Sequence, residues 1–350
     1  MPEPNRGDSV ESWRAHPDLR EDQSSWKARL GIDVEQQIRL VELNHIRYQH
    51  NDIERIVEFL QDFGMQVAKR QDDKIWFKGY GPHPYVYVVV KGDETKFLGG
   101  TFTVERYSDL ERASKLRNST AIHHLDNEPG GGHFVTMYDP AGFPINLIHG
   151  QAADGPDDDV RPPKLLLNYE QEKQRLGSYQ RFSRGPAAVF RLGHFGICYN
   201  DYATAYDFYV HTFNLVPSDI VYLEREGKRT DVSSFLHIDR GDEFTDHHTF
   251  FLSSSKNQRV HHSSFEIHDF DTQLLGHQWL ERKGYKIVWG VGRHLLGSQI
   301  FDYWWDTSGF MIEHYTDGDL VDSKTPVGSI QTTDEALQVW GPIRPVEFLA

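Results

Sequence analysis

The sequence predicts an α+β fold made of two homologous halves, each containing two strand-helix-strands units. Three internal matches carry this prediction. "LNHIRYQHNDIERIVEFLQDFGM" from Leu43 matches "LGHFGICYNDYATAYDFYVHTFNL" from Leu192, "GGTFTVERYSDLERASKL" from Gly99 matches "HHSSFEIHDFDTQLLGHQWL" from His261, and "DPAGFPINLI" from Asp139 matches "DTSGFMIEHY" from Asp306. Internal similarity on this scale is the signature of a duplicated unit.

The first match predicts a strand followed by a capped helix. His45 precedes Asp52 by the same interval that separates His194 from Asp201. The Asn-Asp pair in each copy suits the N-cap of the helix that follows. In the first copy the helical spacing of apolar residues indicates a buried stripe, formed by Ile53, Ile56, Val57 and Leu60, and Gly64 suits the helix end.

The other two matches complete each half. The segments from Gly99 and His261 predict a short alternating strand that runs into an amphipathic helix, and those from Asp139 and Asp306 predict a hairpin turn that leads into a strand.

Composition changes along the chain predict the domain limits. We expect a polar N-terminal extension at 1–39, an N-terminal domain at 40–150, an exposed acidic, proline-containing linker at 151–188, a C-terminal domain at 189–320 and a tail at 321–350.

Composition also limits the partners. The 37 basic and 52 acidic residues of this 350-residue chain give a formal charge of −15, without a Lys/Arg cluster dense enough to follow phosphates, so nucleic acid and anionic membranes are not expected partners. No apolar run approaches the ~20 residues of a membrane helix. The single cysteine, Cys198, excludes an internal disulfide and fits a reducing compartment. We therefore expect a cytoplasmic protein that assembles as a homo-oligomer and acts on a small molecule.

Glu313 is the residue that points to chemistry. It interrupts an apolar strand pattern, where a lone charge costs several kcal/mol unless it is paired or binds a metal. Superposing the repeats places His194, His262 and Glu313 at three strand positions whose first-half equivalents are His45, Gly99 and Asn146. Two histidines and one carboxylate are the ligand set of mononuclear Fe(II) oxygenases. The second half is therefore predicted to bind a metal and the first half to be degenerate.

The motifs "LGHFGI", "VHHSSFEIHDFD", "GVGRH" and "GFMIEHYTDGD", in this order, resemble the extradiol ring-cleaving dioxygenases of the vicinal oxygen chelate superfamily, which open catechols and 2,3-dihydroxybiphenyl-like compounds. The resemblance covers roughly residues 40 to 320. It implies two domains, each of two βαβββ modules that form an open barrel, and a dioxygenase that uses O₂ and Fe(II), with Mn(II) as the alternative ion. It also implies that His194, His262 and Glu313 are the ligands and that His261 is a neighbour.

The same resemblance assigns further site residues. The histidine of "GRH", His294, and Tyr303 are implied to line the substrate side. A family histidine that acts near bound O₂ falls on His247, with His248 one residue away as the alternative. Phe251, Trp289 and Trp304 are candidate walls. Trp289 stands where some members carry an arginine, which argues against a carboxylated substrate such as homoprotocatechuate.

Two other functions remain open at this point. The same fold hosts metal-dependent isomerases and lyases, which consume no O₂, and metal-free proteins that bind aromatic ligands, so fold alone does not establish the reaction.

Overall fold

The computed structural model describes residues 19–333 and 337–348. Its N-terminal half forms one eight-stranded sheet in the order β3-β4-β5-β2-β6-β9-β8-β7. The elements of this half are β2 (Leu40–His50), α3 (Ile53–Asp62), β3 (Gln66–Gln71), β4 (Lys74–Lys78), β5 (Tyr87–Lys91), β6 (Lys96–Val104), α4 (Tyr107–Ser114), β7 (His123–His124), β8 (His133–Tyr138) and β9 (Pro144–His149).

The C-terminal half repeats this order, with three strands longer than their counterparts and two strands added at one edge. Its sheet runs β1-β20-β11-β12-β14-β10-β15-β18-β17-β16, in which β1 is the segment Leu19–Glu21. The short strands β13 and β19 pair separately. The elements are β10 (Val189–Tyr199), α5 (Tyr202–Thr212), β11 (Leu215–Arg225), β12 (Lys228–Ile238), β13 (Thr245–Asp246), β14 (Phe250–Ser254), β15 (Arg259–Ile267), α6 (Phe270–Arg282), β16 (Lys286–Arg293), β17 (Ile300–Trp305), β18 (Met311–Thr316), β19 (Leu320–Val321) and β20 (Val327–Gln331).

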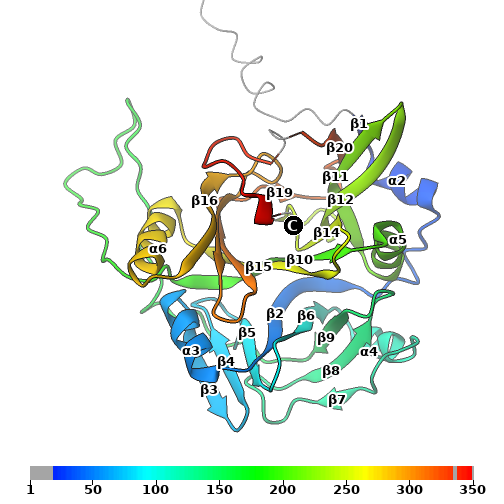
Figure 1. Cartoon of the computed structure of the whole chain (residues 1–350), viewed down its shortest axis with the longest axis horizontal. Helices are drawn as coiled ribbons and strands as arrows, with labels where there is room; N and C mark the ends of the chain where they lie inside the picture. Colours follow the sequence, from blue (N-terminus) through cyan, green and yellow to red (C-terminus); the bar gives the residue numbers. More distant parts are fainter. Residues whose placement is uncertain (1–18, 334–336, 349–350) are drawn as a thin grey trace, which may run out of the picture.

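Four βαβββ modules account for both sheets apart from β1 and β20, which extend one edge of the C-terminal sheet. The modules begin at β2, β6, β10 and β15, and within each half the two first strands lie side by side at the centre of the sheet. The sheets curl, and the helices lie on their outer sides (Figure 1). The predicted α+β fold of duplicated βαβββ modules is therefore confirmed.

Local sequence explains where the helices start. Asp52 accepts a hydrogen bond from the backbone N–H of Arg55, and Asp201 does the same for Thr204, as the Asn-Asp pairs predict. Helix α3 ends before Gly64, whose φ of +101° is the left-handed conformation that glycine adopts most easily.

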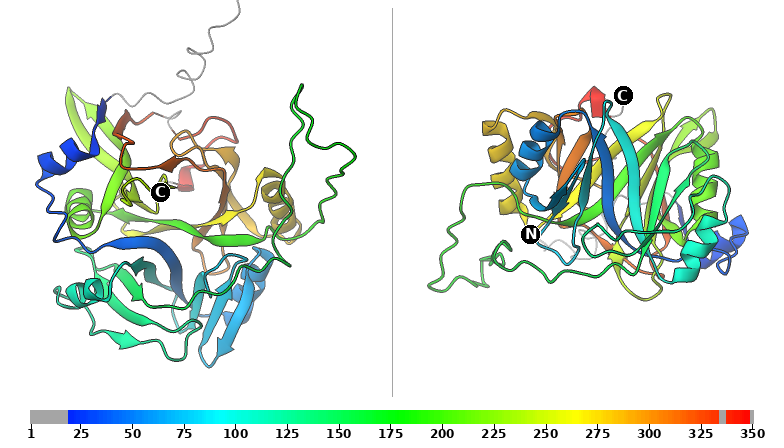
Figure 2. Two further views of the ribbon diagram at one scale, coloured as in Figure 1. Left: turned by 180° about the vertical axis from the view of Figure 1, so that it is seen from behind. Right: turned by 90° about the horizontal axis from the view of Figure 1, so that it is seen from below.

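One apolar core runs through both halves. Strands β2 and β10 lie next to one another across the boundary (Figures 1 and 2), and the rings of Phe102 and Phe195 are 5.9 Å apart there. Gly100 permits this approach, because a Cβ at that position would lie 2.4 Å from the Phe195 ring. The halves are thus packed as one body.

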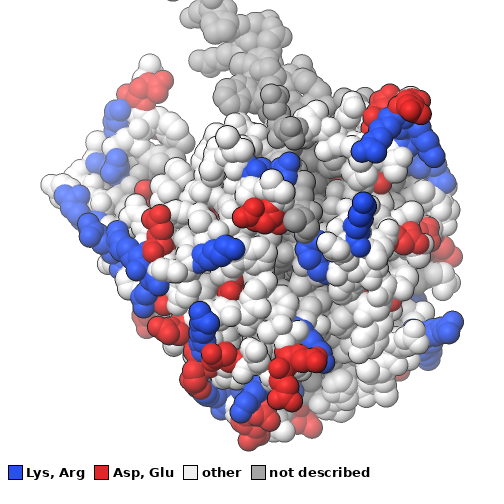
Figure 3. Space-filling model, viewed as in Figure 1, with Lys and Arg blue, Asp and Glu red and all other residues white. Residues whose placement is uncertain are grey.

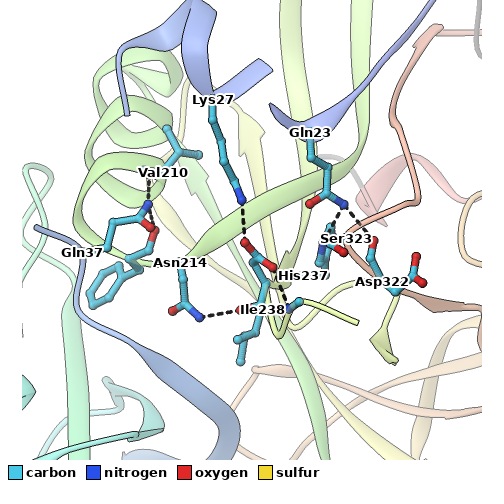
Figure 4. A network of polar contacts seen from close by, with 12 residues as sticks. Gln23, Lys27, Gln37, Val210, Asn214, His237, Ile238, Asp322 and Ser323 are labelled. Atoms are coloured by element: carbon cyan, nitrogen blue, oxygen red, sulfur yellow. Dashed lines mark hydrogen bonds and ion pairs between the residues drawn. The ribbon is translucent and has the colours of Figure 1, made fainter. Parts of the chain in front are cut away.

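The segment before β2 crosses over to the C-terminal half. Strand β1 (Leu19–Glu21) pairs with β20, and helix α2 (Gln23–Leu30) packs beside α5 (Figure 1). Figure 4 shows the polar contacts that hold the segment: the Gln23 amide donates to the carbonyl of Asp322, Lys27 pairs with Asp239, and Gln37 donates to two carbonyls at the end of α5. Described residues of the N-terminal extension are therefore part of the folded C-terminal half, whereas residues 1–18 lie outside the described part.

The segment that joins the halves is a long loop. Between residues 151 and 188 the only strand-like feature is an isolated bridge between Asn168 and Lys173, and the loop projects from the body in Figure 2. On the face shown in Figure 3, basic and acidic side chains are intermingled. None of the described helices is both long and apolar enough to cross a lipid bilayer.

Candidate metal centre

Three side chains from neighbouring strands of the C-terminal half meet at one point. His194 comes from β10, His262 from β15 and Glu313 from β18, and one ligand atom of each lies within 4.8 Å of the others. Their exposed fractions are 1%, 5% and 0%. The strand pairing places them together, because β15 lies between β10 and β18. This part of the chain therefore offers two imidazoles and a carboxylate to a single ion.

The polar atoms at this point lack ordinary partners. Nε2 of His194 is 3.1 Å and Nε2 of His262 is 3.5 Å from Oε2 of Glu313, yet neither Glu313 oxygen accepts a hydrogen bond. Nε2 of His262 and Nδ1 of His194 are also without hydrogen-bond partners. Leaving such groups unsatisfied costs about 1–3 kcal/mol each, more when charged. A bound cation would satisfy the carboxylate and at least one imidazole, so the residues fit a metal.

A second histidine orients His262. The carbonyl oxygen of Phe348 can only accept, so Nε2 of His261 donates to it at 2.8 Å. Burial lowers the pKa of His261 to about 4, so its ring is neutral and Nδ1 accepts from Nδ1 of His262 at 2.7 Å. The lone pair of His262 Nε2 is then free and faces Glu313, which is the arrangement that metal-binding histidines use.

Protonation states also suit a metal. Burial lowers the pKa of His262 well below its ordinary value and keeps the ring neutral. Burial would raise the pKa of Glu313, but the close contact with His194 holds the pKa of that carboxyl below its usual value. Neutral imidazoles and an ionised carboxylate are the forms that coordinate a cation.

His294 and Tyr303 stand beside the three-residue cluster. The carbonyl of Leu337 accepts from Nδ1 of His294 at 2.8 Å, so Nε2 of His294 accepts the Tyr303 hydroxyl proton, also at 2.8 Å. Nε2 of His294 lies 4.0 Å from Oε1 of Glu313. Burial raises the pKa of Tyr303 well above its ordinary value, so the phenol remains a donor.

Of the two candidate histidines His247 and His248, the second lies beside the three-residue cluster. The His248 ring lies 4.2 Å from that of His194, and it lines the same cavity. His247, the residue expected from motif spacing, points the other way and pairs with Asp219 at 2.8 Å. The two adjacent rings line different cavities, so a shift of one residue decides which ring lies beside His194.

The cavity beside the cluster has a volume of about 300 Å³. Its apolar wall is formed by Val221, Leu223, Val232, Phe235, Phe251, Leu296, Leu337 and Phe348, and no Lys, Arg, Asp or Glu is found among the described residues that line it. A larger cavity of about 580 Å³ lies across the 295–298 loop, but it contains none of the three cluster residues.

Two expected wall residues do not line this cavity. Phe251 does, whereas Trp304 is buried in the main core and Trp289 lies behind Tyr303, donating its indole N–H to the carbonyl of Pro342. The wall is instead completed by the tail. Phe348, from the 3₁₀ turn η1 (Val346–Phe348), packs 4.9 Å from the Tyr303 ring. No sequence motif marks Phe348, and only its tertiary contact with Tyr303 shows that it belongs to the site.

Strand registers test the equivalence of the repeats. In the first half His45 pairs with Thr101, and in the second half His194 pairs with Ser264. Thr101 in turn pairs with Asn146, as Ser264 does with Glu313. Two residues before Thr101 and Ser264 stand Gly99 and His262. The three predicted correspondences are therefore those of the structure.

Comparison with known proteins agrees with this architecture. The sequence model of the Glyoxalase/Bleomycin resistance protein/Dioxygenase superfamily matches residues 191–314, the segment that contains the three cluster residues. This segment is thus similar in sequence to that superfamily. Over 317 residues it is 25% identical to metapyrocatechase 2 of Cupriavidus necator, covering 88% of this chain and 91% of that protein.

Solved structures show the same fold. Homoprotocatechuate 2,3-dioxygenase of Brevibacterium fuscum, in complex with 3,4-dihydroxyphenylacetate, superposes with a TM-score of 0.75 and 16% identity, covering 90% of this chain and 93% of that one. The Mn(II)-bound glyoxalase of Novosphingobium aromaticivorans gives a TM-score of 0.72 and 18% identity, covering 89% and 95%. Together with the sequence relative, these findings confirm the resemblance to the extradiol dioxygenase family of the vicinal oxygen chelate superfamily.

Proposed function

We propose that this protein is an extradiol dioxygenase that cleaves the ring of an uncharged, hydrophobic catechol with O₂ at a mononuclear Fe(II), and that His194, His262 and Glu313 hold the ion. The observation that carries the proposal is the buried Glu313 carboxylate, whose oxygens accept no hydrogen bond and face two histidines. The similarity to a metapyrocatechase supports the reaction class.

A bound divalent ion supplies a cation that lowers the pKa of a catechol hydroxyl, together with open coordination positions for exogenous ligands. The protein's own groups then act around it. The phenol of Tyr303 is a donor within reach of His294 Nε2, so the pair can orient a substrate oxygen and hold a proton there. His248, beside His194, is the group placed to exchange a proton with the reacting ring. The apolar wall excludes water.

The cavity supports an uncharged substrate. The 3,4-dihydroxyphenylacetate bound by the Brevibacterium fuscum enzyme carries a carboxylate. Here the described lining residues include no cation to pair with one, and an unpaired carboxylate is costly to desolvate. Alkyl- or aryl-substituted catechols are therefore the proposed substrates.

The two competing functions fit the site less well. A metal-free aromatic-binding protein leaves the Glu313 oxygens and the Nε2 atom of His262 buried and unsatisfied. A metal-dependent isomerase or lyase would use the same three residues, and the similarity to a glyoxalase concerns the fold alone. Oxygen consumption distinguishes a dioxygenase from such an isomerase or lyase.

The test is a substrate panel under controlled iron loading. The protein is loaded with Fe(II) without oxygen, and then catechol, 3- and 4-substituted catechols, 2,3-dihydroxybiphenyl and 3,4-dihydroxyphenylacetate are added in aerated buffer. We expect O₂ consumption with a new visible chromophore for the neutral compounds, and kcat/KM at least about tenfold lower for the carboxylate. Mn(II)-loaded and metal-free samples are the controls. No O₂ uptake by iron-loaded protein across the panel would contradict the proposal.

A further inference from the structure

A second hydrogen-bonded series of side chains leads away from the metal-centre cavity. His248 lines that cavity, and its Nδ1 lies 3.1 Å from Nδ1 of His247. Nε2 of His247 lies 2.8 Å from Oδ2 of Asp219. Asp219 and His247 both line the larger cavity of about 580 Å³. This hydrogen-bonded series of side chains thus connects the metal-centre cavity to the larger cavity.

The donors along this series can be assigned from its end. An ionised carboxylate only accepts, so Nε2 of His247 carries the proton donated to Asp219. When the His247 ring carries only this one proton, its Nδ1 is an acceptor and Nδ1 of His248 is the donor. That leaves Nε2 of His248 without a proton. His248 lines the metal-centre cavity, and Nε2 is its remaining ring nitrogen.

The side chain of His247 is not required to hold its own backbone. The backbone N–H of His247 donates to the carbonyl of Asp319 at 2.9 Å, and the carbonyl of His247 accepts from the Ser218 hydroxyl at 2.6 Å. The loop is therefore anchored through the main chain, and the ring and its carboxylate partner are available for another role.

We propose that His247 and Asp219 are positioning residues that hold His248 as the Nδ1–H tautomer, so that its Nε2 can accept a proton in the metal-centre cavity. The arrangement parallels that of His261 and His262, where the carbonyl of Phe348 accepts from His261 and so fixes the tautomer of His262. The role of this tautomer in turnover rests on the proposed function, whereas the tautomer itself does not.

The direct test is ¹⁵N NMR of metal-free protein labelled at histidine, because one- and two-bond couplings identify which ring nitrogen carries the proton. The His248 signals are assigned by their loss in His248→Gln. In the wild type we expect a protonated Nδ1 and an unprotonated Nε2 on His248. We expect His247→Phe, which keeps a ring but removes both contacts, to abolish this preference. Asp219→Asn keeps the shape of the side chain, but its amide can donate to His247 instead of accepting, so we expect a weaker preference for the Nδ1–H tautomer of His248. This second variant keeps the test valid if His247→Phe does not fold.

A matched control and kinetics complete the test. His268→Phe removes another histidine that contacts an aspartate, Asp269 at 2.7 Å, outside both cavities, and should leave the His248 spectrum and the activity unchanged. With iron-loaded protein and 2,3-dihydroxybiphenyl, His247→Phe should lower kcat about 10- to 100-fold, as loss of an orienting partner does, with KM and iron content nearly unchanged.

The outcomes separate the two proposals. A His248 tautomer that is the same in wild type, His247→Phe and Asp219→Asn, or an unprotonated Nδ1 in the wild type, would overturn the positioning role. An inactive wild type with the expected spectra would instead remove the dioxygenase proposal and leave the tautomer assignment standing. If His247→Phe changes the tautomer of His248 but keeps the kcat of the wild type, the positioning does not serve turnover.

Discussion

The two halves of this protein pair equivalent strand positions in the same register, yet they differ in whether the polar side chains at these positions have hydrogen-bond partners. In the N-terminal half Nε2 of His45 bonds the Thr101 hydroxyl at 3.0 Å, and its Nδ1 bonds the Asn44 side chain at 2.6 Å. Asn146 accepts from Thr136 and donates to the carbonyl of Leu98. The polar side-chain atoms of His45 and Asn146 are therefore satisfied by the protein itself.

The C-terminal half leaves the equivalent atoms open. Ser264, the counterpart of Thr101, has a buried hydroxyl without a hydrogen-bond partner. Both oxygens of Glu313, the counterpart of Asn146, are also buried without a hydrogen-bond partner. Each such group lowers stability by about 1–3 kcal/mol unless something binds there. A histidine by itself therefore does not distinguish a structural centre from a ligand site. At these equivalent positions of the two halves, the difference is whether the neighbouring polar atoms are satisfied by the protein.

The largest difference between the halves should be metal affinity. Glu313→Gln removes the only negative charge of the cluster, so we expect affinity for Fe(II) to fall by more than about 100-fold. A substitution in the other half, His45→Gln at the counterpart of His194, should leave the affinity for Fe(II) unchanged. Metal content after dialysis and calorimetric titration measure both. Equal iron in Glu313→Gln and wild type would remove this residue from the site.

An attempt to restore the N-terminal site should fail. Gly99 has a φ of +103°, and a Cβ there would lie 2.6 Å from the backbone oxygen of Pro144. We therefore expect Gly99→His combined with Asn146→Glu to bind no second ion and to lower the free energy of unfolding by about 3 kcal/mol or more, from backbone strain, overlap and a buried charge.

Gly142→His is the control for that experiment. Gly142 has a φ of +88° but open space around its missing Cβ, so its cost should be limited to the backbone strain of about 1–3 kcal/mol. Two metal ions per chain in the double variant would show that the repeats differ less than the geometry indicates.

A smaller effect should be shared by both halves. Burial lowers the pKa of His50 in the N-terminal half and of His237 in the C-terminal half to about 3, from an ordinary value of 6.5. Between these values the unfolded chain binds more protons, so stability is complete above pH 6.5 and declines as the pH falls toward 3. At pH 5 each residue should cost about 2 kcal/mol.

Urea unfolding of metal-free protein at pH 7.5 and pH 5 measures this cost. His50→Gln and His237→Gln should each flatten the pH dependence by a similar amount, and His124→Gln, on the exposed strand β7, serves as the surface control. A pH dependence carried by one half alone would show that the two buried histidines are not equivalent.

The sequence by itself determined the duplicated framework and the three clustered residues. Strand pairing in a half-buried sheet keeps a strict register, because a slip of one residue exposes the whole apolar face. Positions that align in the repeats therefore align in space, and a carboxylate in an apolar strand was visible as an anomaly. The helix caps Asp52 and Asp201 were likewise readable, since capping depends on neighbouring residues only.

Only the tertiary structure decided which ring of the His247–His248 pair lines the metal-centre cavity. It also brought Phe348 and Leu337 from the tail to complete the wall of that cavity. The packing of the described part of the N-terminal extension on the C-terminal half was likewise visible only there. These contacts join segments far apart in the chain, and no local periodicity records them. The orientation of one residue in a loop, and the docking of a tail, depend on the surface that the rest of the fold presents, so they follow from packing and not from pattern.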